Sequence, residues 1–204
     1  MIEWLRRRLF PPACVVCDAP GPALCAACAP ASGGIAFAVD GVPAFALGAY
    51  DGPLRQAVVA MKRGQRDPVD AFAALLDAAP LPLHGPLVPL PTTGRRAAAR
   101  GFDQAVLLAR ALARLRGVAC VELLDKRGRP QAGRSRRERL AGSGRFRLRA
   151  GVPAPPEVTL LDDVCTTGAT LRDALRTVSD AGIVVRGIVV VARTDGTHPA
   201  LGRS

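Results

Sequence analysis

Residues 159–170 read TLLDDVCTTGAT, and this stretch decides how the rest of the sequence is interpreted. It begins as an apolar run that predicts a buried strand, yet the run ends in two neighbouring carboxylates, Asp162 and Asp163. Small hydroxyl residues and a glycine follow, and residues 168–182 predict a helix that ends at a glycine. A strand that turns directly into a helix places the carboxylates at the carboxyl edge of a sheet, where α/β proteins bind ligands.

The turn between this strand and helix has the chemistry of an anion site. A helix N-terminus offers unpaired N–H groups and the positive end of the helix dipole. The threonines of the turn add hydroxyl donors, and Gly168 lets the backbone approach a phosphate closely. Ionised carboxylates only accept hydrogen bonds, so Asp162 and Asp163 suit vicinal hydroxyl groups of the same ligand. We interpret the motif as a cradle for a ribose 5-phosphate; the alternative is a capped helix with incidental acids.

Strands and helices alternate along the chain around this motif. Apolar runs bounded by turn residues predict strands at 43–50, 85–91, 118–123, 157–163 and 183–192. Amphipathic patterns predict helices at 51–64, 67–79, 101–117 and 168–182, the first two capped by Asp51 and Asp67. This alternation predicts an α/β fold with a mostly parallel sheet and helices on both faces.

Four of the six cysteines lie in CVVCDAPGPALCAAC, residues 14–28. Two C-x-x-C pairs let four thiolates converge on one tetrahedral Zn²⁺, so we expect a closed structural zinc site made by Cys14, Cys17, Cys25 and Cys28. Disulfides or a redox pair are the alternatives. Each pair has a similar tail, DAP and AP, as if one turn were used twice. We divide the chain into a short helix and zinc-ribbon-like module at 1–30, a linker at 31–42 and the α/β domain at 43–204.

The net charge of +11 is concentrated in one segment. Residues 95–149 contain 16 Lys and Arg against 4 Asp and Glu, which suggests an anionic partner such as a polyphosphate or nucleic acid. With 26 Arg and 2 Lys in the chain, a solvated basic face is an equally good interpretation. No apolar run approaches the ~20 residues that span a bilayer, and no signal peptide is evident. We therefore expect a cytoplasmic protein without membrane insertion.

The stretch VTLLDDVCTTGATL resembles the motif with which type I phosphoribosyltransferases bind 5-phosphoribosyl 1-pyrophosphate (PRPP). Other segments resemble the ComF family, which joins such a domain to an N-terminal cysteine module. They are GAYDGPLRQAVVAMKRG (48–64), LVPLPTTGRRAAARGFDQAVLLARALA (87–113), RGRPQAGRSRRERLAG (127–142) and VVVAR (189–193). The resemblance covers nearly the whole chain and implies a type I phosphoribosyltransferase-like fold. Asp103 stands where the family usually has Asn, and residues 29–50 lack further cysteine pairs, which implies one zinc.

The resemblance also implies roles for particular residues. Pyrophosphate would leave the ribose with Mg²⁺ bridging its oxygens, and a nitrogen nucleophile would arrive. Asp162 and Asp163 would be the catalytic residues and would hold the ribose hydroxyls. The substrate-binding residues implied are Lys62, Arg95, Arg96, Arg100, Asp162, Asp163, Val164, Cys165, Thr166, Thr167, Gly168, Ala169 and Thr170. In this interpretation Arg134, Arg136 and Arg137 belong to an arm that closes over the leaving group.

Three functions remain open from the sequence. The first is transfer of phosphoribose from PRPP to an unknown acceptor. The second is a competence-type accessory role in DNA uptake, with single-stranded DNA or a helicase as partner, and the third is regulatory binding without turnover. Only Phe102 and Phe146 supply aromatic rings in the basic segment, which weighs against a dedicated single-strand binder. The sequence predicts neither the acceptor nor the oligomeric state.

Overall fold

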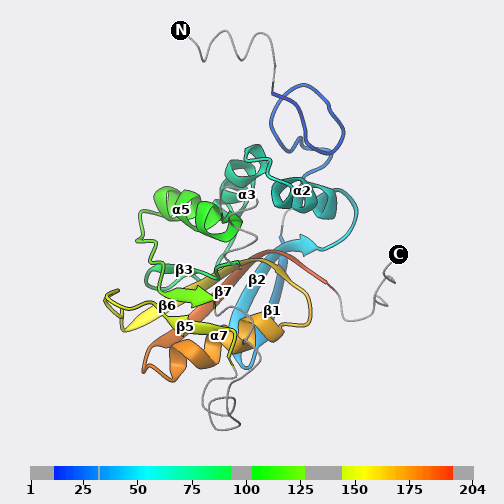
Figure 1. Ribbon diagram of the computed structural model, residues 1–204. Coiled ribbons are helices and arrows are strands. Elements are labelled where there is room, and N and C mark those ends of the chain that lie inside the picture. Colours follow the sequence, from blue (N-terminus) through cyan, green and yellow to red (C-terminus); the bar gives the residue numbers. More distant parts are fainter. Residues whose placement is uncertain (1–11, 32, 93–102, 127–143, 195–204) are drawn as a thin grey trace, which may run out of the picture.

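A computed structural model of the protein describes residues 12–31, 33–92, 103–126 and 144–194 (Figure 1). Its centre is a five-stranded sheet with the order β1-β2-β7-β6-β3. The strands are β1 (Ile35–Val39), β2 (Val42–Ala49), β3 (Leu87–Pro89), β6 (Glu157–Cys165) and β7 (Val184–Arg193). β2, β7, β6 and β3 run parallel, and β1 pairs antiparallel with β2. The mostly parallel sheet predicted from the alternating pattern is therefore confirmed.

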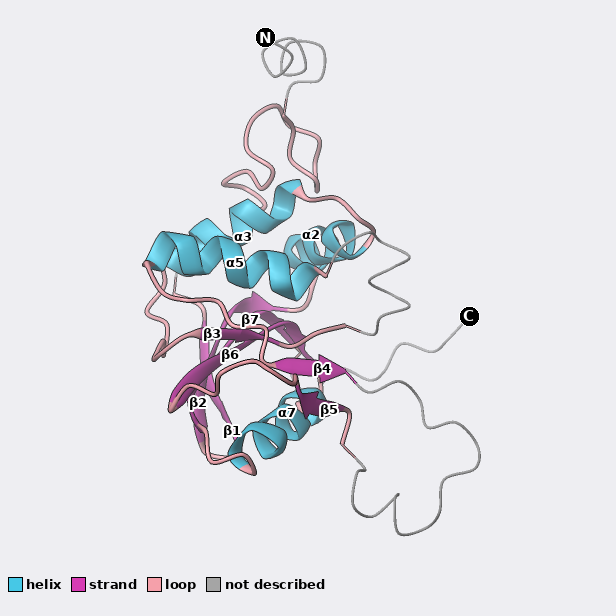
Figure 2. Cartoon of the chain, turned by 60° about the vertical axis from the view of Figure 1, so that its left-hand side comes forward, coloured by secondary structure: helices cyan, strands magenta, loops and turns pink. Residues whose placement is uncertain are grey.

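Helices cover both faces of this sheet (Figure 2). One face carries α2 (Gly52–Lys62), α3 (Asp67–Asp77) and α5 (Gln104–Arg116), and the other carries α7 (Ala169–Ser179). A two-stranded sheet of β4 (Leu124–Lys126) and β5 (Phe146–Leu148) lies beside α7. Side chains of successive β6 residues point to opposite faces of the sheet: Leu161 packs against the core on the face covered by α2, α3 and α5, and Leu160 packs on the face covered by α7.

The helices predicted at 51–64, 67–79, 101–117 and 168–182 are present in the part of the chain that the structure describes, with differences at two of their starts. α5 begins after Asp103, whose side chain accepts a hydrogen bond from the Ala105 N–H, and ends at Gly117 with φ 65°. The end at Gly117 is as the sequence predicts, whereas the start lies three residues later than the predicted residue 101, because Asp103 caps the helix. Asp67 is the first residue of α3 rather than its cap, and Arg66 holds the cap position. The following proline tolerates either arrangement, because N–H groups in the first turn have no helical partner anyway.

Two short segments differ from the sequence-based expectation. Residues 31–42, expected as a linker, contain β1, which a two-residue turn at Asp40 and Gly41 joins to β2. Both turn residues have positive φ, 48° and 82°, as tight hairpins require. The strand expected at 118–123 makes only a single bridge, between Cys120 and Leu87, and regular pairing begins later, at β4.

Some expectations fall on residues that the structure does not describe. They concern the short helix expected at the start of the 1–30 module, over residues 1–10, the loop arginines Arg95, Arg96 and Arg100, and the arm residues Arg134, Arg136 and Arg137. Among the described helices, none is both long enough and apolar enough to cross a membrane.

Candidate functional site

A pocket opens where β6 extends beyond its neighbour β3. Pairing with β3 ends at Leu161, whereas pairing with β7 continues to Cys165. Asp162 and Asp163 therefore lie past the end of β3 at the carboxyl edge of the sheet. The pocket there has a volume of about 320 Å³. Of the predicted substrate-binding residues, those that line it are Lys62, Asp162, Asp163, Val164, Thr166 and Thr170.

The two carboxylates have different surroundings. The Lys62 ammonium, at the last residue of α2, lies 3.1 Å from Asp163 Oδ2 and 5.9 Å from the centre of the Tyr50 ring. Asp162 Oδ1 accepts a hydrogen bond of 2.8 Å from the Asp163 N–H. Removal from water, together with the nearby charge of Asp163, raises the pKa of Asp162 well above its usual range. Asp163 is thus an ion-paired carboxylate, whereas the surroundings of Asp162 disfavour its charged form.

The threonine turn lies beside these carboxylates and leads into α7. Gly168 occupies the cap position with φ 72°, a conformation that strongly favours glycine. The Thr167 hydroxyl oxygen is 3.4 Å from the Ala169 N–H, and the Thr167 carbonyl accepts a 2.6 Å hydrogen bond from Arg172. Thr166 and Thr170 line the pocket, whereas Cys165, Thr167, Gly168 and Ala169 belong to the same turn without lining it. The turn and the acids are brought together as expected, and their role in binding stays a prediction.

The pocket also contains residues that the sequence analysis did not place there. They come from the end of β3 and the start of α5, at residues 90–92 and 103–105, and from Lys126 at the end of β4. Asp103 accepts hydrogen bonds from the Thr92 N–H at 2.7 Å and the Ala105 N–H at 3.1 Å. Burial raises the pKa of Asp103 above its usual value. The cap at Asp103 is visible in the sequence, but its place in the pocket depends on how α5 packs.

The four module cysteines form one cluster beyond α2 and α3, in the dark blue segment of Figure 1. Their sulfur atoms all lie within 4.8 Å of one another, and the Cys17 and Cys25 sulfurs are 3.7 Å apart. Sulfurs about 2.3 Å from a tetrahedral Zn²⁺ are about 3.8 Å from each other, so the cluster fits a structural metal such as zinc. The backbone supports the fit, because one turn is used twice: Asp18 N–H donates to the Cys14 carbonyl and Ala29 N–H to the Cys25 carbonyl.

Electrostatics of the cluster also favour a cation. Hydrogen bonds from backbone N–H groups, foremost that of Cys25, lower the pKa of Cys14 to about 6. Removal from water, and the neighbouring sulfurs, raise the pKa of Cys28 to about 12. Four thiolates this close repel one another unless a positive ion lies between them. The four cysteines can therefore all be thiolates when a metal ion lies between them, but not in its absence.

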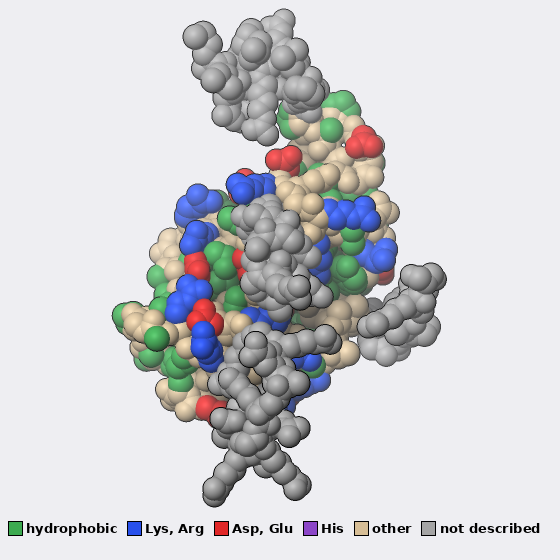
Figure 3. Space-filling view, viewed as in Figure 1, with side chains coloured by type: hydrophobic (Ala, Val, Ile, Leu, Met, Phe, Trp, Pro, Cys, Tyr) green, Lys and Arg blue, Asp and Glu red, His purple; other side chains and the backbone are tan. Residues whose placement is uncertain are grey.

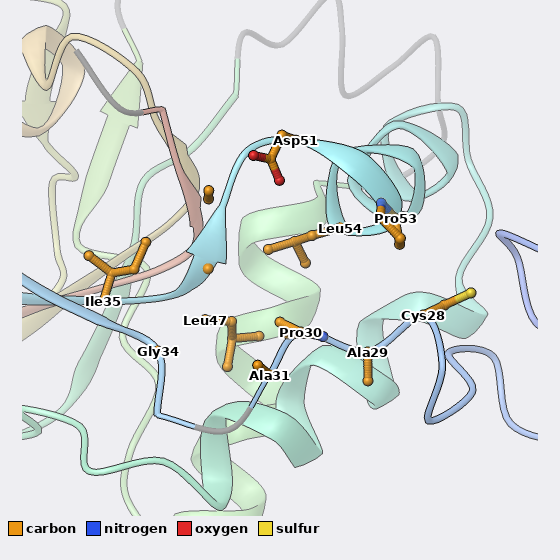
Figure 4. A pocket seen from close by; sticks show the side chains of 12 residues that line it. Cys28, Ala29, Pro30, Ala31, Gly34, Ile35, Leu47, Asp51, Pro53 and Leu54 are labelled. Atoms are coloured by element: carbon orange, nitrogen blue, oxygen red, sulfur yellow. The ribbon is translucent and has the colours of Figure 1, made fainter. Parts of the chain in front are cut away.

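A second pocket lies between the end of the cysteine module, β1, β2 and the start of α2 (Figure 4). Its volume is about 360 Å³, and its walls are mainly apolar side chains such as Leu47, Leu54 and Ile35. Among the described residues of this wall, Asp51 is the charged side chain, and none of them is a lysine or an arginine. A phosphate therefore suits the pocket at the end of β6, which contains Lys62 and Lys126, better than this one.

Many arginines of the described basic segment are paired with acids. Arg110 and Arg149 both bond Glu122, and Arg149 and Arg147 both lie within 3.5 Å of Asp125. Figure 3 shows blue and red side chains alternating on this face rather than one continuous basic surface. These contacts join α5 to the β4–β5 pair. The described part of the segment therefore matches the solvated, ion-paired face, and nine of its arginines lie in residues 93–102 and 127–143.

Comparisons with known proteins identify two relatives. No family model matches the chain. The chain is 35% identical to Competence protein ComFC of Streptococcus pneumoniae over 96 residues. This matched segment covers 47% of this chain and 42% of that protein. It is 34% identical over 99 residues to Competence protein ComFC of Bacillus subtilis, covering 48% and 40%. The matched part thus spans less than half the length of either relative. Over that part, the two matches support assigning the chain to the ComF family.

Proposed function

We propose that the pocket at the end of β6 binds PRPP, or a related ribose 5-phosphate, and supports phosphoribosyl transfer to an acceptor. The observation that carries the proposal is the composition of one pocket wall. Two adjacent carboxylates, Asp162 and Asp163, share it with Thr166 from the turn before α7 and Thr170 from the first turn of α7. The fold supports the same proposal, because a parallel sheet that presents this turn at its carboxyl edge suits a type I phosphoribosyltransferase-like domain.

In this proposal, different described residues bind different parts of the ligand. The carboxylates accept hydrogen bonds from the vicinal ribose hydroxyls, and the turn at the start of α7 takes the 5-phosphate. Lys62 lies 3.1 Å from Asp163 and so borders the diol, where its charge also attracts the pyrophosphate. The carboxylates of this wall are hard oxygen ligands of the kind that Mg²⁺ prefers, and a Mg²⁺ bound with the ligand would supply positive charge to the leaving group.

The chemistry requires no nucleophile from the protein. As pyrophosphate leaves, positive charge develops on the ribose ring, and a carboxylate near the diol stabilises that charge. The pocket holds the sugar at both ends, which fixes C1 for an incoming nitrogen nucleophile. Asp163 is held by its ion pair to Lys62, so it stays in place without a ligand. In this proposal the described residues orient the sugar and supply charge beside its diol.

A second candidate function follows from the names of the relatives. Both are competence proteins, so we also consider an accessory role in DNA uptake, in which the chain binds single-stranded DNA or a helicase partner without turnover. The arginines of residues 127–143 would then bind phosphates, and affinity for DNA would fall steeply with salt. Arg136→Ala with Arg137→Ala should flatten that salt dependence by about two in slope; an unchanged slope would remove the arm from this proposal.

Calorimetric titration of Mg²⁺–PRPP into the zinc-loaded protein tests the proposed function. The test variant is Asp162→Asn with Asp163→Asn, and the matched control is Asp70→Asn with Asp180→Asn, two exposed acids on α3 and after α7. We expect binding by wild type and control, and at least tenfold weaker binding by the test variant, because two hydrogen-bonded carboxylates are lost. No binding by the wild type would contradict the proposal and favour the DNA or partner-protein function.

A further inference from the structure

The β4–β5 pair reaches the candidate pocket from the α7 side. Its strands pair antiparallel, with Lys126 opposite Phe146. Lys126 lines the pocket, and its ammonium lies 5.6 Å from the centre of the Phe146 ring. Arg145 immediately precedes β5 and therefore lies at the same end of the pair. The β4–β5 pair thus places Lys126 in the pocket wall and Arg145 in contact with Thr170, which also lines the pocket, and neither cation belongs to the sequence motif.

Arg145 is attached to α7 by two independent contacts. Its backbone N–H donates to the Asp173 carboxylate, and its guanidinium Nη1 donates to the Thr170 hydroxyl oxygen at 2.9 Å. The first contact does not involve the side chain, so a substitution at Arg145 leaves it intact. The second joins an exposed guanidinium directly to a hydroxyl that lines the pocket. One contact therefore fixes the chain, and the other acts on the pocket.

The contact with Thr170 determines what that hydroxyl offers to a ligand. A threonine hydroxyl has one proton to donate and two lone pairs that accept. Because Arg145 donates to the oxygen, the hydroxyl proton remains for an acceptor inside the pocket. A charged donor also polarises the O–H bond and strengthens the hydrogen bond that it makes. The arrangement suits a strongly accepting, negatively charged group, which is a phosphate.

We propose that Arg145 is a positioning residue that acts through Thr170 and makes the pocket selective for a phosphate monoester at the start of α7. This inference rests on the proposed function, since it assigns the sugar 5-phosphate to that end of the pocket. Lys126 adds positive charge on the same side. The substrate class that this predicts is a phosphorylated pentose, not the unphosphorylated sugar and not pyrophosphate by itself.

Competition against bound Mg²⁺–PRPP tests the inference, with D-ribose 5-phosphate and Mg²⁺–pyrophosphate as the two competitors. The test variant is Arg145→Gln, and Arg145→Lys restores the charge. The matched control is Arg147→Gln, which removes an equally exposed cation two residues away that pairs with Asp125 at 3.5 Å. Thermal unfolding of each variant verifies that β5 stays attached through the Asp173 contact.

We expect Arg145→Gln to weaken ribose 5-phosphate about tenfold, because a charge-assisted contact is lost, and to change Mg²⁺–pyrophosphate less than twofold. Arg145→Lys should recover most of the loss, and Arg147→Gln should bind both competitors like the wild type. Equal weakening of both competitors, or an unchanged affinity for ribose 5-phosphate, would overturn the inference alone. A wild-type protein that binds no PRPP would overturn the proposed function and this inference with it.

Discussion

Replacing Gly168 by alanine tests whether the turn before α7 is the phosphate site. Gly168 has φ 72°, and a Cβ atom there would lie 2.9 Å from Arg172 Nη1. A left-handed conformation costs a non-glycine residue roughly 1–2 kcal/mol. The Arg172 guanidinium lies at the end of a flexible side chain and can move away. It then loses its hydrogen bond to the Thr167 carbonyl, and such a bond contributes roughly 0.5–1.5 kcal/mol to stability. We expect Gly168→Ala to lower the free energy of unfolding by about 2–3 kcal/mol.

Gly182 provides the matched control at the other end of the same helix. It has φ 78°, and an added Cβ would have no atom within 4 Å. Gly182→Ala should therefore show the backbone cost alone, about 1–2 kcal/mol, and leave the pocket unchanged. For a chain of this length, each kcal/mol lowers Tm by roughly 2–4 °C.

The assay combines urea unfolding with titration of Mg²⁺–PRPP. Gly168→Ala should bind PRPP at least tenfold more weakly than the wild type, because the turn can no longer present its N–H groups, whereas Gly182→Ala should bind normally. If both variants lost the same stability and both still bound PRPP with wild-type affinity, the turn would not be the phosphate site.

Three further predictions concern the metal, pH and ion pairs. Reduced protein expressed with ample zinc should contain about one Zn²⁺ per chain, and Cys17→Ser but not Cys120→Ser should lose it; wild-type protein without zinc would contradict this. Folding raises the pKa of Asp162, so the contribution of this carboxyl group to the free energy of unfolding is fully present below its pKa in the unfolded chain. That contribution is lost as the pH rises through the pKa of the group in the folded protein. Asp162→Asn should thus be more stable than wild type in urea at pH 7, with a gap that closes toward pH 4; a gap independent of pH would refute it. Arg149→Gln removes ion pairs to Glu122 and Asp125, each 3.0 Å and partly exposed, so we expect the free energy of unfolding to fall by about 1 kcal/mol. Arg186→Gln, which removes one exposed ion pair, should lower it by less. Equal losses in the two variants would contradict a role for Arg149 in holding β4 and β5 together.

Local signals in the sequence were sufficient for the long elements. α5 ends at Gly117 as the sequence predicts, although it begins after Asp103 rather than at residue 101. The short strands were missed because their signals are weak: β4 and β5 have three residues each, and charged residues adjoin or interrupt them. β1 is rich in alanine and is preceded by glycines, so composition suggested a linker. Its status as a strand depends on pairing with β2, which composition does not reveal.

The site residues likewise fall into those that one sequence motif predicts and those that only tertiary packing brings to the site. Asp162, Asp163 and the threonine turn are contiguous in the sequence, so one motif predicts them together. Asp103 and Lys126 reach the pocket, and Arg145 reaches its residue Thr170, through the packing of α5 and of the β4–β5 pair. No spacing in the sequence links these residues to the motif, because their positions are set by tertiary contacts. Lys62 was predicted only through the family resemblance, and its ion pair with Asp163 is the contact that explains its place.

A crystal structure of the zinc-loaded protein with Mg²⁺–PRPP tests the central claim most directly. We predict that the ribose hydroxyls lie within hydrogen-bond distance of Asp162 and Asp163, and that the 5-phosphate contacts the N–H groups at the start of α7 and the Thr170 hydroxyl. A ligand bound in the opposite direction, with its 5-phosphate away from Thr170, or bound in the apolar pocket beside Asp51, would contradict the claim.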